Sequence, residues 1–481
     1  MTSVPLPAPR RGLVINCSRT SKIPVSYLLS SRTQVGPSAR AKRTIGCHMK
    51  RAIFSWCLFD WANSAYPTVV TTFVFAAYFT KAVVGDPTEG AYLWGLATAA
   101  AGLTVAVGGP IFGAIADRTG QRKFWLAICT LVAIAGCAGL WTVKPDPSDA
   151  VTALVLVAIA TIGFEFGTIF YNAMLPGLVA ADRLGRVSGW SWGLGYFGGL
   201  SCLAAALLIF VQAETPPFGL DKNAAEHIRA TCLLVAVWFA IFALPLFIFT
   251  PETAPKMRPG QARPDGIAVA IKTGLQQLLT TLREVRTQPM LLRFLLARMI
   301  YTDGLVTLFA FGGIYAAGTF GMSFSDIIIF AIALNITAGL GALSFAWIDD
   351  WLGSKTTIVA GLIGLLITGA AVLSVHHVTG FWIAAVTLGI FVGPVQAASR
   401  TLMARFAPSD QRGEMFGLFA LSGKATAFVG PALVGWISLI TDSQRLGMTV
   451  ILGFWLLGLI LIWGLQPGPP KQSADDRQAV G

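Results

Sequence analysis

At positions 113–123 the chain reads Gly113-Ala-Ile-Ala-Asp-Arg-Thr-Gly-Gln-Arg-Lys123, a short cationic turn between two long apolar runs. Glycine suits the tight turn at Gly120, and Gly113 allows neighbouring helices to approach closely. A weaker copy, with two acids and one lysine but no arginine, follows later as Ala346-Trp-Ile-Asp-Asp-Trp-Leu-Gly-Ser-Lys355. A charged turn that recurs between apolar runs indicates a membrane protein built twice from one plan.

The composition of the 481-residue chain is that of a membrane protein. Hydrophobic residues make up 55% of the chain and charged residues 12%, about half of the ~25% that is usual in soluble domains. The apolar residues form runs of roughly 20, long enough to cross the ~30 Å hydrocarbon layer as helices. Because backbone polar groups must be satisfied inside the bilayer, and the sequence lacks an alternating strand pattern, we expect an all-α membrane protein.

Twelve membrane spans are predicted, in two groups of six that are separated by a long polar stretch. We expect a leader (1–48), a first six-helix bundle (49–250), a cytoplasmic linker (251–290), a second six-helix bundle (291–466) and a cytoplasmic tail (467–481). The predicted spans are 53–80, 91–115, 124–143, 151–174, 187–211, 230–250, 291–317, 325–348, 356–375, 380–402, 415–440 and 447–465.

Lys and Arg side chains are concentrated on one side of the predicted spans. By the positive-inside rule, the side with fourteen of these residues is the cytoplasmic side and the side with five is the outer side. Both termini are therefore expected in the cytoplasm, and we expect a bacterial inner membrane. The formal charge of +12 is gathered in the leader and these loops, so we expect the lipid bilayer and no nucleic acid as a partner.

The leader and the linker each allow two interpretations. Residues 1–48 hold eight Lys or Arg and no acid, a composition typical of an organellar transit peptide. Poor helical amphipathicity favours instead a start codon assigned too early, with Met49 as the true beginning; in either case we expect a disordered leader. In the linker, a helical repeat of apolar residues predicts an amphipathic helix on the cytoplasmic membrane surface, with a mobile tether as the alternative. The repeat consists of Ile271, Leu275, Leu278, Leu279, Leu282 and Val285.

Side chains that hold metals or cofactors do not gather in this sequence. The seven Cys form no CxxC pair and five of them fall within apolar spans, which is typical of small core residues. The four His lie outside the predicted spans, and the sequence has no nucleotide-binding loop or nucleophile–base pair. We therefore expect no metal site, no cofactor and no enzymatic activity.

Ionisable residues inside the spans are candidates for a transport path, because a charge in mid-bilayer costs at least ~2.5–3.5 kcal/mol and usually pairs or faces water. Glu165 lies near the middle of span four without a cation close in sequence. Since burial disfavours the charged form of an unpaired carboxyl group, Glu165 is the first candidate for taking up and releasing a proton. Asp60 and Asp303 are alternatively ion-paired latches, and a structural role is the alternative for all three acids.

Cations in the spans offer partners for these acids or for a solute. The cations are Arg298, Arg400 and Lys424, and either of the last two is expected to suit the carboxylate of an amino acid. The full set of transport-path candidates is Asp60, Asn63, Glu165, Asn172, Asp303, Gln396, Arg400 and Lys424.

The pattern Gly113-x-x-x-Asp117-Arg118-x-Gly120-x-Arg122-Lys123 resembles the signature loop of the major facilitator superfamily, whose halves are parallel repeats of six spans. Five further segments resemble its "unknown major facilitator" family, which is related to the autophagy-associated vacuolar effluxer for which amino-acid export is proposed. These segments are Trp56-Cys-Leu-Phe-Asp-Trp-Ala-Asn-Ser-Ala-Tyr66, Tyr301-Thr-Asp-Gly304, Gln396-Ala-Ala-Ser-Arg400, Glu414-Met-Phe-Gly417 and Gly423-Lys424.

The resemblance implies twelve helices in two six-helix pseudo-repeats and a gating loop on the cytoplasmic side. We expect Asp117 to cap a helix N-terminus or to pair with a cation of the facing half, and a merely topogenic basic loop is the alternative. The second copy lacks arginine, so we expect the first half to supply most cations of the latch. The expected gating residues are Gly113, Asp117, Arg118, Gly120, Arg122, Lys123, Asp350 and Gly353.

The sequence as a whole predicts a secondary transporter that moves a small polar solute by alternating access. The resemblance suggests an amino acid as solute and efflux as direction, and protons are the candidate coupling ion. A transporter-like membrane receptor or regulator without transport is the alternative function.

Overall fold

The computed structural model describes residues 39–252, 269, 276, 279–281 and 283–465. The chain divides into two compact units, Met1–Cys47 and His48–Gly481. Of the first unit only residues 39–47 are described; they begin helix α1 (Ala39–Asn63), whereas we expected them in a disordered leader. The rest of the leader and the tail 467–481 lie outside the described residues.

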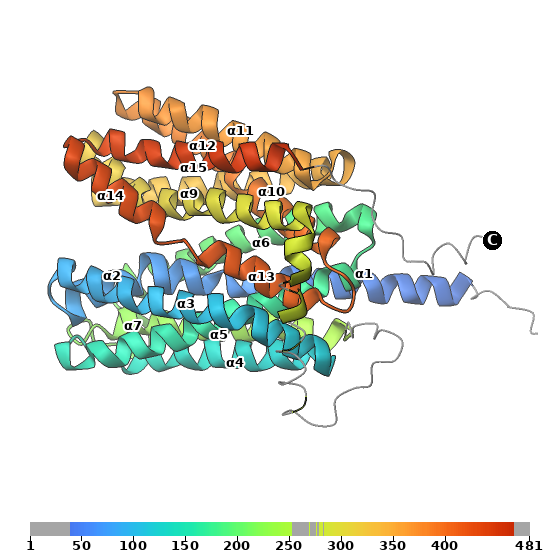
Figure 1. The fold of residues 1–481 in the computed structure, drawn as a ribbon. Coiled ribbons are helices and arrows are strands. Elements are labelled where there is room, and N and C mark those ends of the chain that lie inside the picture. Colours follow the sequence, from blue (N-terminus) through green and yellow to red (C-terminus); the bar gives the residue numbers. More distant parts are fainter. Residues whose placement is uncertain (1–38, 253–268, 270–275, 277–278, 282, 466–481) are drawn as a thin grey trace, which may run out of the picture. The chain divides into compact units, whose positions relative to one another are not determined.

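The described residues form helices and no strand, and eleven helices are long and apolar enough to cross a membrane. Together with a broken first span they confirm the predicted plan of twelve spans in two bundles (Figure 1). After α1, the first bundle contains α3 (Pro87–Thr119), α4 (Arg122–Gly139), α5 (Ala150–Leu178), α6 (Leu184–Ala205) and α7 (Glu226–Phe249). The second bundle contains α9 (Pro289–Phe320), α10 (Phe324–Leu352), α11 (Ser354–Ser374), α12 (Val378–Phe406), α13 (Arg412–Lys424), α14 (Val429–Thr441) and α15 (Gln444–Trp463).

The first span is not one continuous α-helix, because Pro67 interrupts it. Proline lacks an N–H group, and its ring clashes with the carbonyl group four residues earlier. That residue is Asn63, at which α1 ends. The span continues as a π-helical stretch (Tyr66–Phe73), the short helix α2 (Phe75–Tyr78) and a π-helical turn (Phe79–Val83). The break therefore falls less than one turn after the candidate residue Asp60.

Span eleven is broken in the same manner and is divided into α13 and α14. Pro431 excludes a regular hydrogen bond to Ala427, the residue four positions earlier. Between the two helices, the N–H of Ala427 donates to the Lys424 carbonyl group at 3.4 Å, and the N–H of Val429 donates to Thr426 at 2.7 Å. The break follows directly on Lys424, so both broken spans carry a candidate residue next to the interruption.

The linker lies mostly outside the described residues. Of the six apolar positions that predict an amphipathic helix, only two are described: Leu279 is exposed and Val285 is buried. Residues 283–287 are helical. The placement of this helix on a membrane surface stays a prediction.

Candidate functional site

Two pairs of helices hold the bundles together, and glycines set their separation. Helix α3 packs on α13, where Gly113 lies directly against the carbonyl group of Gly413. Helix α6 packs on α10, where a Cβ atom at Gly189 would lie 2.6 Å from the carbonyl oxygen of Ala342. Small residues at such positions let helix backbones approach closely. Both contacts lie in the halves of α3 and α6 that adjoin the charged loops.

Asp117 of the signature loop is buried and contacts both bundles. Arg122 of the same loop donates to Asp117 Oδ1 from Nη2 at 2.6 Å and from Nε at 3.0 Å. From the second bundle, the backbone N–H of Glu414 donates to Asp117 Oδ2 at 3.0 Å. Because Glu414 lies in the first turn of α13, Asp117 caps a helix of the facing bundle, while its cation comes from its own loop. Gly120 closes α3 in the left-handed conformation, with φ +68°.

The other cations of the signature loop make different contacts. Lys123 Nζ donates to the carbonyl group of Thr250 at 2.7 Å, and its backbone N–H donates to the Glu252 carboxylate at 3.2 Å. These bonds tie the loop to the end of α7 within the first bundle. Arg118 lies within electrostatic range of Glu414 in the second bundle.

The second copy of the loop makes an equivalent contact with the first bundle. Asp350 accepts a hydrogen bond from the backbone N–H of Arg186 at 3.2 Å, in the first turn of α6. Arg186 Nε lies 3.3 Å from Asp350 Oδ2, so the first bundle supplies the arginine that this copy lacks. The neighbouring Asp349 instead pairs with Arg405 of its own bundle at 3.4 Å. Gly353 ends α10 with φ +86°.

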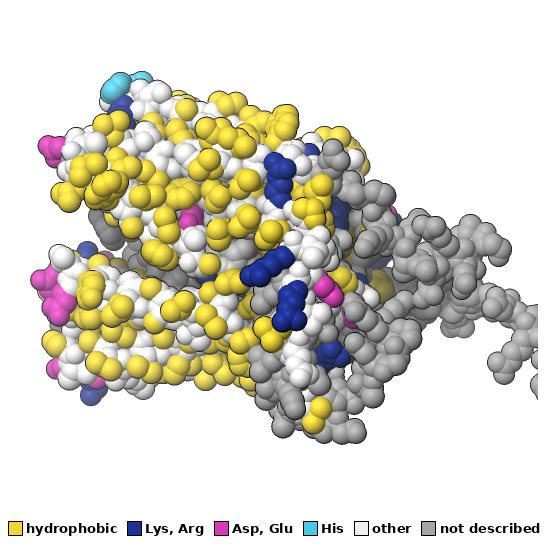
Figure 2. Space-filling view, viewed as in Figure 1, with side chains coloured by type: hydrophobic (Ala, Val, Ile, Leu, Met, Phe, Trp, Pro, Cys, Tyr) yellow, Lys and Arg dark blue, Asp and Glu magenta, His cyan; other side chains and the backbone are white. Residues whose placement is uncertain are grey.

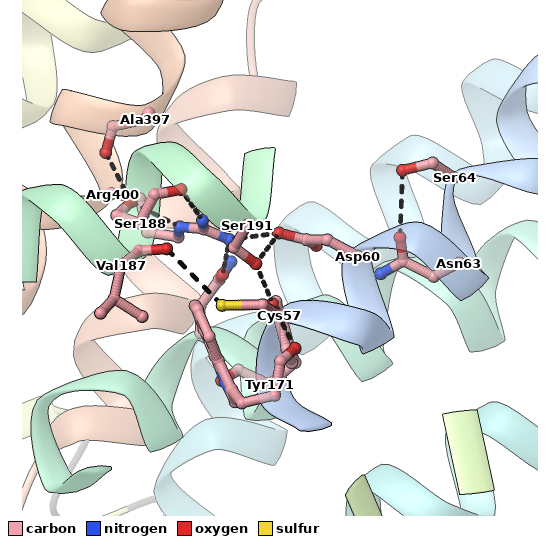
Figure 3. Close-up of polar contacts among 12 residues, drawn as sticks. Cys57, Asp60, Asn63, Ser64, Tyr171, Val187, Ser188, Ser191, Ala397 and Arg400 are labelled. Atoms are coloured by element: carbon pink, nitrogen blue, oxygen red, sulfur yellow. Dashed lines mark hydrogen bonds and ion pairs between the residues drawn. The ribbon is translucent and has the colours of Figure 1, made fainter. Parts of the chain in front are cut away.

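Deeper between the bundles, Asp60 of α1 and Arg400 of α12 form an ion pair (Figure 3). Arg400 Nη1 lies 2.9 Å from Asp60 Oδ2, and the two side chains are only 3% and 13% exposed. Arg400 also donates to the Ser188 hydroxyl group at 2.9 Å, to the Ser188 carbonyl group at 2.7 Å and to Asn172 Oδ1 at 3.3 Å. The guanidinium group is therefore fully engaged by protein groups, as a latch requires.

Hydroxyl groups and aromatic rings hold this ion pair in position. The Ser191 hydroxyl group donates to Asp60 Oδ2 at 2.5 Å and lies 2.6 Å from the hydroxyl group of Tyr171 (Figure 3). The Trp56 ring stacks on Tyr171 with a centroid distance of 4.4 Å and lies 5.0 Å from the Arg400 guanidinium carbon. Cation–π contacts of this kind add to the attraction by the carboxylate.

Glu165 and Lys424 form a second ion pair between the bundles. Lys424 Nζ lies 2.7 Å from Glu165 Oε1, and the side chains are 35% and 19% exposed respectively. Glu165 lies near the middle of α5, whereas Lys424 is the last residue of α13 before the break. This pair is more accessible than the Asp60–Arg400 pair and therefore better suited to exchange its contacts with a solute. Sequence reasoning missed this pairing because the two residues are 259 positions apart.

The remaining candidates lie apart from these two ion pairs. Asn63 accepts a long hydrogen bond of 3.4 Å from Ser64 and points away from Arg400 in Figure 3. Gln396 joins the bundles by accepting a hydrogen bond of 2.7 Å from Tyr196. Asp303 is 2% exposed, and within the described part of the chain it forms no ion pair and its Oδ1 has no hydrogen-bond partner. Asp303 thus differs from both other acids, which are paired.

Arg298 of α9 is a polar residue that the sequence-based candidate set does not include. Its guanidinium carbon lies 3.4 Å from the centroid of the Phe419 ring, and Nη1 donates to the Ser422 hydroxyl group at 2.8 Å. Nη1 also donates to the carbonyl group of Phe419. A cation inside an apolar span was the available signal, but its neighbours on α13 could not be read from the sequence.

The two ends of the bundles differ in how closely they approach. The bonds described above lie between the charged loops and the middle of the helices. On the face seen in Figure 2, hydrophobic side chains cover both bundles, and the surface between the bundles is hollowed at the opposite end, where α14 meets α15. The interface is therefore closed at the end of the charged loops and open at the other.

Twelve spans in two such bundles, with a charged loop after the second span, define a transporter of the major facilitator class. The proton:xylose symporter XylE, bound to 6-bromo-6-deoxy-D-glucose, has the same fold, with a TM-score of 0.69 at 13% identity. The match covers 90% of this chain and 99% of that chain.

The chain belongs to the family described as "Vacuole effluxer Atg22 like", whose model matches residues 91–472. The "Uncharacterized MFS-type transporter YxiO" of Bacillus subtilis is 26% identical over 85% of this chain and 93% of that protein. Autophagy-related protein 22 of Cryptococcus neoformans is 25% identical over 56% of this chain and 50% of that protein, so this match spans half of the fungal relative. The resemblance inferred from the sequence motifs is confirmed.

Proposed function

We propose that this protein moves an amino acid across the membrane by alternating access, with the Glu165–Lys424 pair as its solute site. The observation that carries the proposal is that this ion pair joins the two bundles and remains partly exposed. It offers a carboxylate to the ammonium group of an amino acid and an ammonium group to its carboxylate. A solute that replaces these contacts also replaces a bond between the bundles, which couples binding to their relative motion.

The Asp60–Arg400 pair and the signature loops act as the gate in this proposal. They form the closed end of the interface, on the side that the positive-inside rule assigns to the cytoplasm. The structure then corresponds to a state that is open to the outside of a bacterial inner membrane, with both termini in the cytoplasm. The description of the family as vacuole effluxers supports efflux as the direction of transport.

Proton coupling is assigned to Asp303 in this proposal, rather than to Glu165 as the sequence suggested. Glu165 is already engaged in an ion pair with Lys424 at 2.7 Å. The buried Asp303 forms no ion pair with a described residue. A buried carboxyl group without a counter-ion is the group that gains most from binding a proton.

The proposal is tested with the full chain reconstituted in liposomes and a panel of radiolabelled amino acids, under an imposed proton gradient. We expect flux of at least one amino acid, and a loss of about tenfold or more in Glu165→Gln and in Lys424→Gln, since a tenfold change corresponds to ~1.4 kcal/mol of lost binding. Matched controls are Glu214→Gln and Lys144→Gln, which change exposed loop residues. Equal losses in controls and site variants would count against the assigned site.

The same preparation distinguishes transport from the receptor alternative. Thermal stabilisation of the protein by an amino acid, without flux in either direction, would support a receptor or regulator without transport. The absence of both binding and flux for every amino acid in the panel would overturn the proposed function.

A further inference from the structure

Arg298 brings a third charge to the Glu165–Lys424 pair. Gly423, the sequence neighbour of Lys424, lies against the Arg298 guanidinium: a Cβ atom there would lie 2.8 Å from Nη1. Glu165 of the facing bundle lies within electrostatic range of the same guanidinium group. Two cations of the second bundle and one carboxylate of the first bundle therefore meet between the bundles.

The positive charges exceed the negative charges at this place. Lys424 is paired with Glu165, whereas none of the ion pairs between described residues includes Arg298. The bonds of Arg298 to Ser422 and to the Phe419 carbonyl group satisfy N–H donors but do not neutralise the charge. An unpaired charge inside the membrane is costly. The site formed by Glu165, Lys424 and Arg298 therefore has one positive charge more than it has carboxylates.

Arg400 does not share this property, although both arginines are on the second bundle. Asp60 neutralises Arg400, and four of its hydrogen bonds end on the first bundle. Among the described residues, the hydrogen bonds of Arg298 end on α13 of its own bundle. The arginine without a paired carboxylate among the described residues, Arg298, is thus the one beside the accessible Glu165–Lys424 pair.

We propose that the solute is an acidic amino acid, an inference that rests on the proposed function and narrows its solute class. The ammonium group of the solute binds Glu165, the α-carboxylate binds Lys424, and the side-chain carboxylate binds Arg298. The three charges of the site are then each opposed by one charge of the solute. A neutral amino acid leaves Arg298 without an anion, and a dicarboxylate without an amino group leaves Glu165 without a cation.

The test compares solutes of equal shape and different charge in the reconstituted full chain. Glutamate is compared with glutamine, aspartate with asparagine, and succinate serves as the dicarboxylate without an amino group. We expect the acids to show a KM at least about tenfold lower than their amides. The thermal stabilisation of the detergent-purified protein by each solute provides a second readout that does not depend on transport direction.

The variant Arg298→Gln tests the assigned residue through a ratio within one preparation. We expect the KM ratio of glutamine to glutamate to fall to about one, because the contact that recognises the side-chain carboxylate is lost. Arg298→Lys, which retains a charge, restores part of the preference. Arg51→Gln, which changes an exposed residue of α1, leaves the ratio as in the wild type. A partly misfolded variant lowers the maximal transport rate of both solutes but does not change the ratio of their KM values.

Three results would overturn the inference. If the wild type shows equal KM values for acids and amides, or prefers neutral amino acids, the solute is not an acidic amino acid. The proposed amino-acid transport is not affected by that result. A preference for succinate removes the amino group from the recognised solute. Binding and transport of no amino acid at all contradict the proposed function as well, so the two failures are distinguishable.

Discussion

Arg400 and Asp60 are 340 positions apart in the chain, yet their side chains meet at 2.9 Å and join the two bundles inside the membrane. A pair this deeply buried adds little net stability compared with apolar residues, but the loss of one partner is expensive because a charge is left behind. The pair therefore specifies one arrangement of the bundles more than it strengthens either bundle.

Asp60→Asn is expected to lower the thermal unfolding midpoint of the purified protein. The change leaves the Arg400 charge without its carboxylate, which for buried pairs costs about 3–5 kcal/mol; the partial exposure of Asp60 reduces this value. Asp60→Asn combined with Arg400→Gln should recover part of the loss, since no buried charge remains. A double variant whose loss equals the sum of the two single losses would show that the residues are not coupled.

Gly113→Ala is expected to open the closed end of the interface. An added methyl group meets the backbone of Gly413, which cannot move as a flexible side chain would. The accessibility of a cysteine introduced at Asp410 to a membrane-impermeant thiol reagent should rise, and transport should fall. Gly95→Ala on the same helix is the control, because no atom of the described residues lies within 4 Å of an added Cβ there. Equal effects of both substitutions would point to a general disturbance of α3.

Asp303→Asn is expected to abolish the pH dependence of transport while solute exchange without a gradient continues. In the wild type the rate should rise as the pH on the loading side falls, because protonation removes a buried, unpaired charge. The asparagine cannot be protonated, so the transport rate of the variant should not change with pH across the range in which the wild-type rate changes. If Asp303→Asn retained the slope and Glu165→Gln lost it, Glu165 would be the coupling acid, as the sequence first indicated.

Pro431→Ala is expected to slow transport while leaving solute binding nearly intact. Restoring an N–H group at this position favours a continuous helix through the break that follows Lys424. A straight span eleven would hinder the motion of Lys424 relative to Glu165. Pro245→Ala, in the uninterrupted helix α7, is the control for a proline inside a span. Binding by thermal shift and flux in liposomes separate the two effects.

The fold could be predicted from the sequence because its signals are local. Runs of apolar residues, the charged turn after span two and its weaker copy together predict the two-bundle plan. The breaks in spans one and eleven also had a local signal, Pro67 and Pro431, which the uninterrupted predicted spans did not take into account.

The partners of the charged residues could not be predicted, since they depend on how the two bundles meet. Asp60, Glu165 and Asp303 look alike in the sequence, as single acids in apolar spans. In the structure two of them have cations from the facing bundle, and the third forms no ion pair with a described residue. The three acids differ because of how helices far apart in the sequence pack together. The spacing of residues along the chain does not reveal this packing.

The two loop aspartates have a consequence for how long the closed state lasts. In neither α6 nor α13 does the N-cap side chain accept a hydrogen bond from the first turn of the helix. Asp350 and Asp117 accept these bonds instead, from across the interface. Each such bond is worth about 1 kcal/mol, so separating the bundles exposes two helix ends at a combined cost near ~2 kcal/mol. That amount holds the closed arrangement roughly thirtyfold more populated than it would be without the bonds. Each half of the protein thus caps a helix of the other half. The rate at which the closed state opens therefore depends in part on the replacement of two carboxylates by water at these helix ends.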